Sequence, residues 1–213
     1  TSVQFSHATP AGFVAHNISR NNYAAIANEM IYNSATDVII GCGAPDYDDN
    51  GNPASKDTKY VGGATTWTDL TDDYSVLGAD ADADGNADYW TVIRDRTDFQ
   101  SLAEGDTSTR VIGIPRVNTT LQQSRGGDGY ADPYTVSLTE SVPTLVEMTK
   151  AALNILDNNQ NGFFLMIEGG AVDWASHAGQ SGRMIEEQID FNRAVEAVVD
   201  WVQNNSNWGE TLV

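Results

Sequence analysis

The segment 163–179 constrains the fold and the chemistry of this chain more than any other part of its sequence. Five consecutive apolar residues, 163–167, lead directly into Glu168, a glycine pair, Asp173 and His177. A short, continuous apolar run predicts a β-strand that is buried on both faces, as in a parallel sheet covered by helices. Glu168 would then follow the carboxyl end of that strand, where open α/β sheets hold their ligands.

Asp173 and His177 stand four positions apart, so a helical turn would place both side chains on one face. Two carboxylates and an imidazole at the mouth of a strand suit hard and borderline metal ions. The pattern therefore predicts a metal site here. An ordinary surface pair on a helix is the alternative for Asp173 and His177, with Glu168 as an acid that faces water.

The remaining pattern alternates between helices and buried strands. It predicts strands at 37–40 and 111–115, and helices at 9–14, 23–31, 143–156 and 182–204. Together with the strand at 163–167, this alternation is typical of a doubly wound α/β fold, a mostly parallel sheet flanked by helices. Residues 44–109 are rich in Gly, Asp, Asn and Thr, which predicts a loop-rich insertion with short strands.

The densest acidic motif of this insertion places Asp80, Asp82 and Asp84 on alternate residues, followed by glycine and by Asp88. Such alternating oxygen ligands with glycine at the sixth place resemble a calcium-binding loop. Its twelfth position is Thr91, so the bidentate acid is absent. A calcium site and a solvated acidic turn are the two interpretations.

The chain is strongly acidic, with 11 Lys and Arg against 30 Asp and Glu and a formal net charge of −19. Such a surface repels nucleic acids and anionic membranes, so we expect neither as a partner. It also repels phosphate-bearing substrates unless bound cations reverse the local sign. No signal peptide and no apolar run long enough to span a bilayer is present in these residues.

Three blocks of this sequence resemble the alkaline phosphatase family. They are Glu168-Gly169-Gly170 with Asp173 and His177; Phe5-Ser6-His7-Ala8-Thr9-Pro10-Ala11, which continues to Ser19-Arg20; and Asn161-Gly162-Phe163-Phe164-Leu165-Met166. The chain is most similar to the marine and cold-adapted bacterial branch, which shares His7, Trp174 and a large loop insertion. The resemblance covers most of the chain.

The resemblance implies a centre that holds two zinc ions and one magnesium ion. Asp173 and His177 would bind zinc, and Thr9 and Glu168 would bind magnesium. Arg20 would clamp the phosphoryl group, because its planar guanidinium suits two phosphoryl oxygens and stays charged at alkaline pH.

Two further residues would surround these ligands. His7 would lie on the magnesium side and reach the ion through water, which would tune metal preference. Trp174 would lie beside the bound substrate.

The implied reaction is the hydrolysis of phosphate monoesters by a metal-activated serine through a phosphoserine intermediate. The partners would be small-molecule phosphate monoesters, with a homodimer as a candidate assembly, in the periplasm or outside the cell. The 213 residues contain no Asp-Ser-Ala block for the nucleophile. We therefore expect residues 1–213 to be the central part of one α/β domain, with 44–109 inserted in it, and to be inactive alone.

Two other functions remain open at this point. A sulfatase or a phosphodiesterase of the same superfamily would use similar metal ligands. A non-catalytic binding module, stabilised by calcium around residues 46–88, would need no active site.

Overall fold

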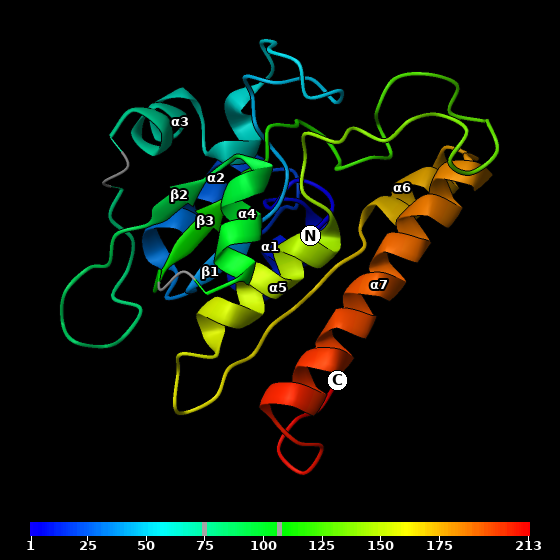
Figure 1. The fold of residues 1–213 in the computed structure, drawn as a ribbon. Coiled ribbons are helices and arrows are strands. Elements are labelled where there is room, and N and C mark those ends of the chain that lie inside the picture. Colours follow the sequence, from blue (N-terminus) through cyan, green and yellow to red (C-terminus); the bar gives the residue numbers. More distant parts are fainter. Residues whose placement is uncertain (74–75, 106–107) are drawn as a thin grey trace.

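The computed structural model describes residues 1–73, 76–105 and 108–213, and its centre is a parallel three-stranded sheet (Figure 1). The strands are β1 (Val38–Ile40), β2 (Thr91–Ile93) and β3 (Val111–Gly113), in the spatial order β1-β3-β2. Both pairings are parallel. The predicted α/β fold, a parallel sheet flanked by helices, is confirmed.

Helices lie on both sides of this sheet. They are α1 (Ala8–Val14), α2 (Tyr23–Asn28), α3 (Ala64–Thr68), α4 (Arg96–Ala103), α5 (Leu145–Leu156), α6 (Ala171–His177) and α7 (Ser181–Asn205). Short helical turns cover Glu29–Asn33, Thr58–Val61 and Asp69–Asp73. No helix of the described residues is both long and apolar enough to cross a membrane.

The two faces of the sheet pack against different helices because alternate side chains of a strand point in opposite directions. On one face, Ile39 and Ile112 pack with Met30, from the turn that follows α2. On the other face, Val111 packs with Phe99 of α4, in a cluster that also contains helix α5. Strands buried on both faces explain the continuous apolar runs that predicted them.

The predicted helices 143–156 and 182–204 are confirmed as α5 and α7. Helix α5 begins after Thr144, whose Oγ1 accepts a hydrogen bond from the backbone N of Glu147 at 3.2 Å. In return, the Glu147 carboxylate accepts from the backbone N of Thr144 at 2.7 Å. This reciprocal capping fixes where the helix starts.

The segment 122–139, which we call the clamp, ties the N-terminal half of α7 to the rest of the molecule. Its Arg125 is buried and donates to the Glu186 carboxylate of α7 at 2.8 Å. The same guanidinium donates to the backbone carbonyls of Gln122, Val136 and Ser137 at 3.1, 2.9 and 3.0 Å. One buried cation therefore holds both the clamp's own turns and α7.

The predicted buried strand at 163–167 is wrong. These residues lie outside the sheet, and the side chains of Phe163 and Phe164 are 37% and 76% exposed. Figure 1 shows the segment as an extended chain between α5 and α6. Strand formation needs a neighbouring strand in reach, and β1, the strand on this side of the sheet, pairs only with β3.

The segment 44–109 combines a short strand, of the kind its composition predicts, with helices. It contains the short edge strand β2, and also helices α3 and α4, which its weak periodicity did not predict. Residues 74–75 and 106–107 of this segment lie outside the described part of the chain. The boundaries of an insertion therefore stay a prediction.

Candidate metal and phosphate site

Helix α6 places Asp173 and His177 side by side, as their spacing predicts. The His177 Nε2 lies 3.4 Å from the Asp173 Oδ1, and the two side chains are 83% and 72% exposed. The opposite face of α6 is anchored, because Ala171 is buried and its backbone N donates to the Ser2 Oγ at 3.1 Å. The nitrogen and oxygen donors therefore converge on an open surface.

The glycine pair before α6 permits close packing around Glu168. A Cβ atom on Gly169 would lie 3.0 Å from the Phe191 ring. One on Gly170 would lie 2.9 Å from both the Val3 side chain and the Glu168 carboxylate. Side chains at these two positions would push α6 away from its neighbours, so the pair helps to set the distance between Glu168 and α6.

Glu168 is half-buried and is held by the first residues of the chain. Its Oε2 accepts a hydrogen bond from the Thr1 Oγ1 at 2.5 Å, and its backbone O accepts from the Ser2 N at 3.1 Å. The Glu168 Oε1 has no hydrogen bond within the described residues, so it is available for a ligand.

His7 links the parts of the site through its ring. The Trp174 ring of α6 meets it edge-on at a centroid distance of 5.1 Å. On another side, the Tyr23 ring of α2 stacks on it at 5.6 Å with an interplanar angle of 13°. These contacts fix the imidazole between α2 and α6.

The surroundings of His7 lower its pKa. Burial is the largest cause and the nearby Arg20 charge is the second, while Glu168 and Asp173 act in the opposite direction. The imidazole is therefore neutral at alkaline pH. After burial, the charges of Arg20, Glu168 and Asp173 also act on the pKa of His7.

Thr9 and Arg20 are the least constrained of the predicted residues. Helix α1 begins at Ala8, after His7, so Thr9 lies in its first turn and does not cap it. Ala8 has a φ of 27°, which is strained for a residue with a Cβ atom. The side chains of Thr9 and Arg20 are exposed and form no hydrogen bond within the described residues. Thr9 and Glu168 are thus not joined by a direct contact.

The residues present fit the metals that the family resemblance implies. Asp173 and His177 supply the oxygen and nitrogen donors that zinc accepts, already 3.4 Å apart. Glu168 and Thr9 supply the carboxylate and hydroxyl oxygens that suit magnesium, a hard cation.

The acidic loop of residues 80–88 is a separate cluster. The carboxylates of Asp80, Asp82 and Asp88 lie within 4.8 Å of one another. Asp84 is not part of this group, and its Oδ1 accepts from the Asn86 N at 2.8 Å. Figure 1 shows the loop beside β2, on the side of the sheet away from α6. Calcium binding there stays a prediction.

The reasoning from sequence missed the aromatic residues that continue the site from His7. Tyr23 lies 4.7 Å from the Tyr60 ring, and the Lys59 ammonium lies 4.9 Å from the centroid of Tyr60. No spacing or motif connects these positions in the sequence, because they meet only through the packing of α2 against the turn at Thr58–Val61.

Comparisons with known proteins identify the family of this chain. The family model described as alkaline phosphatase matches residues 1–213. Alkaline phosphatase 3 of Bacillus subtilis (strain 168) is 26% identical over 212 residues, which cover 96% of this chain and 36% of that protein. The alkaline phosphatase of Escherichia coli (strain K12) is 26% identical over 235 residues, covering 97% of this chain and 46% of that protein.

A solved structure gives the same result for the fold. The cold-active alkaline phosphatase of the psychrophile Shewanella sp. superposes with a TM-score of 0.63 at 25% identity. The match covers 95% of this chain and 39% of that one. The chain therefore spans less than half the length of these relatives.

Proposed function

The chain belongs to the alkaline phosphatase family, and from that premise we propose that it forms part of a metal-dependent site that hydrolyses phosphate monoesters. The observation that carries the proposal is the approach of His177 to Asp173, at 3.4 Å on an exposed face of α6. After burial, the charges of Arg20 and Glu168 act on the pKa of His7 in opposite directions. The substrates are small-molecule phosphate monoesters, and the activity belongs to the periplasm or the exterior of the cell.

In this proposal Asp173 and His177 hold zinc, and Thr9 and Glu168 hold magnesium. Bound divalent metals supply positive charge that stabilises a phosphoryl transition state and activates a nucleophile. Such cations would also offset the chain's formal charge of −19, which repels an anionic substrate.

The other residues of the proposed site bind and orient the substrate. Arg20 presents an exposed guanidinium that can donate two parallel hydrogen bonds to phosphoryl oxygens. The neutral His7 ring, held by Trp174 and Tyr23, offers a hydrogen-bonding nitrogen without adding a positive charge. Trp174 adds an apolar wall beside the substrate.

Zinc binding tests the first part of the proposal. We expect Asp173→Asn to weaken zinc binding by at least about tenfold in calorimetric titrations. The substitution removes the negatively charged oxygen donor and leaves His177 as the only strong zinc ligand of the pair. The matched control is Asp200→Asn, at an exposed position of α7. Equal zinc affinity in the Asp173 variant and the unmodified chain would contradict the assignment.

Phosphate binding tests the proposed function itself. We expect inorganic phosphate to bind the chain only in the presence of zinc and magnesium, and Arg20→Gln to weaken that binding by at least about tenfold. Arg193→Gln, at an exposed position on α7, is the control for loss of one positive charge. Undiminished phosphate binding by the Arg20 variant would overturn the role of Arg20, and binding without metals would overturn the metal-dependent site.

A further inference from the structure

A row of side chains leads from His7 to a lysine on the surface. The Tyr23 ring stacks on His7, and the Tyr60 ring lies 4.7 Å from Tyr23. The Lys59 ammonium lies over both tyrosine rings, 5.9 Å from the centroid of Tyr23 and 4.9 Å from that of Tyr60. Contacts of this length hold a cation on aromatic faces while its head stays in water. We call Tyr23, Tyr60 and Lys59 the tyrosine row.

Backbone contacts fix the tyrosine row to the segment that carries His7. The Ser6 Oγ, on the residue before His7, donates to the backbone O of Tyr60 at 2.8 Å. At the end of the same turn, the Asn28 Nδ2 of α2 donates to the Gly62 O at 3.0 Å. Gly62 has a φ of 94°, and a Cβ atom there would overlap the Asn28 side chain. The position of Lys59 therefore depends on a fixed turn and not only on a long, flexible side chain.

The row begins beside the residue proposed to bind the phosphoryl group. Arg20 lies in a turn closed by the hydrogen bond from the Asn22 N to the Ser19 O at 3.2 Å, and α2 starts at Tyr23 directly after it. The Arg20 charge also acts on the pKa of His7, on which Tyr23 stacks. One short segment thus carries both the guanidinium and the first ring of the tyrosine row.

The Lys59 ammonium is charged and easily reached. Its ion pair is with Asp57, at 3.3 Å, and the two side chains are 44% and 60% exposed. The hydrogen bond with Asp57 is the largest cause that raises the pKa of Lys59, so the cation persists at alkaline pH. Exposed ion pairs of this kind contribute little to stability, so an anion from solution can replace Asp57 at small cost.

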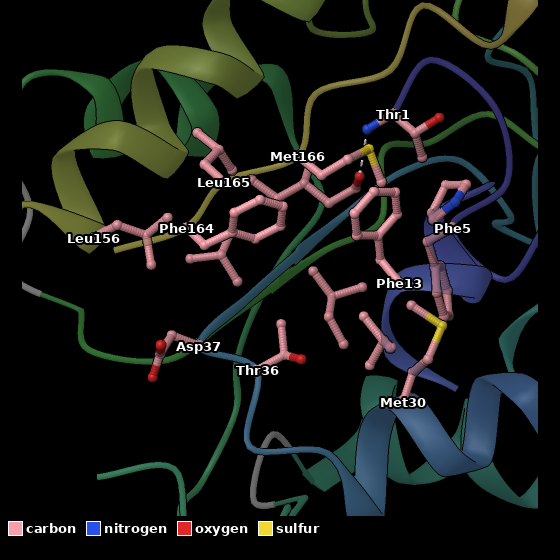
Figure 2. A pocket seen from close by; sticks show the side chains of 15 residues that line it. Thr1, Phe5, Phe13, Met30, Thr36, Asp37, Leu156, Phe164, Leu165 and Met166 are labelled. Atoms are coloured by element: carbon pink, nitrogen blue, oxygen red, sulfur yellow. Dashed lines mark hydrogen bonds between the residues drawn. The ribbon is translucent and has the colours of Figure 1, made fainter. Parts of the chain in front are cut away.

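An apolar cavity in this half of the molecule does not suit an anion. It has a volume of about 260 Å³ and is lined by side chains such as Phe13, Met30 and Phe164 (Figure 2). Among the described residues that line it, the charged side chain is that of Asp37. An anionic group there would lose its hydration and meet a like charge. The tyrosine row offers a cation at an exposed position instead.

We propose that Lys59, held on the rings of Tyr23 and Tyr60, binds a carboxylate on the alcohol part of the substrate. The site would then prefer phosphate monoesters that carry such a carboxylate. This inference rests on the proposed function, because it requires the phosphoryl group to be held near Arg20. One ammonium balances the single charge of a carboxylate, whereas a second phosphate would leave excess negative charge on a chain of formal charge −19.

The test compares two esters that differ in one charge, 4-carboxyphenyl phosphate and 4-carbamoylphenyl phosphate. Each is titrated calorimetrically into the chain in the presence of zinc and magnesium. We expect the carboxylate ester to bind about fivefold more tightly than the amide, and this preference to shrink as salt is added. Without a local cation, the acidic chain would favour the uncharged amide. Phosphoglycolate and its amide form a second pair with a shorter reach.

Two variants should move the preference in opposite directions. Lys59→Gln should reverse it, so that the amide ester binds more tightly than the carboxylate ester. Asp57→Asn should increase it, because the competing charge is lost while an oxygen that can accept from the Lys59 N remains. Lys56→Gln removes the same charge from an exposed position three residues away and should keep the preference of the unmodified chain.

Each result decides the proposal. Equal affinities within both pairs of esters would overturn it, and so would a preference that survives in Lys59→Gln. If the amide esters bind the metal-loaded chain and the carboxylates add nothing, this inference fails while the proposed function stands. If none of the four esters binds, both fail together.

Discussion

Replacing Arg125 with methionine is expected to lower the free energy of unfolding by about 3–5 kcal/mol. Arg125 is 5% exposed and forms a 2.8 Å ion pair with Glu186, which is also buried. The substitution leaves the Glu186 carboxylate without the Arg125 cation, and it leaves the backbone carbonyls of Val136 and Ser137 without their donor. Urea denaturation followed by circular dichroism measures the loss.

Two variants separate the buried charge from simple loss of a contact. Arg116→Met removes an ion pair with Asp95, and the side chains of these two residues are 41% and 50% exposed. The substitution should change the free energy of unfolding by less than about 1 kcal/mol. The double variant Arg125→Met with Glu186→Met should recover part of the loss, because no charge is then left unpaired. A double variant no more stable than Arg125→Met would show that the uncompensated Glu186 charge is not the cause.

Raising the pH from 5 to 9 is expected to destabilise the chain through Glu187. Burial raises the pKa of this carboxyl to about 8, and the neighbouring charges of Asp190 and Glu186 add to the effect against the opposing Arg125. The Glu187 Oε1 has no hydrogen-bond partner within the described residues. A buried carboxyl in this position is more favourable in its neutral form.

The sign of the effect follows from proton binding. The folded chain keeps the Glu187 proton up to about pH 8, whereas an unfolded chain releases it near the ordinary value of 4.5. The stabilisation is therefore complete below pH 4.5 and is lost as the pH rises through about 8. Glu187→Gln should remove this dependence, and it should make the variant more stable than the unmodified chain at pH 9.

Urea denaturation at pH 5, 7 and 9 measures this prediction. Glu196→Gln, at an exposed position of the same helix, is the control and should keep the pH dependence of the unmodified chain. If the free energy of unfolding of the Glu187 variant changes with pH as much as that of the unmodified chain, other groups cause the pH dependence.

The parts of the fold that sequence predicted well are those set by local interactions. Helix α5 follows from its apolar stripe and from the capping box between Thr144 and Glu147, which spans only four residues. The strand at 163–167 failed for the opposite reason. Five apolar residues favour a strand, but pairing depends on a distant neighbour, and β1 does not reach this segment.

The same distinction applies to the candidate site. Asp173 and His177 meet because one turn of α6 separates them, so their spacing was sufficient. The stack of His7 on Tyr23 joins two segments through tertiary packing, which no spacing encodes. In the acidic loop, the alternation of Asp residues placed Asp80, Asp82 and Asp88 together, but it did not predict that Asp84 would turn to a neighbouring backbone amide.

The hydrogen bond between the Thr1 hydroxyl and Glu168 joins residues 167 positions apart. Closing so long a loop carries a large entropic penalty, and contacts of this separation form late unless other structure has already brought the ends together. The sheet and α5 join segments that lie nearer in the sequence. We therefore expect the contact between Thr1 and Glu168 to form after them during folding.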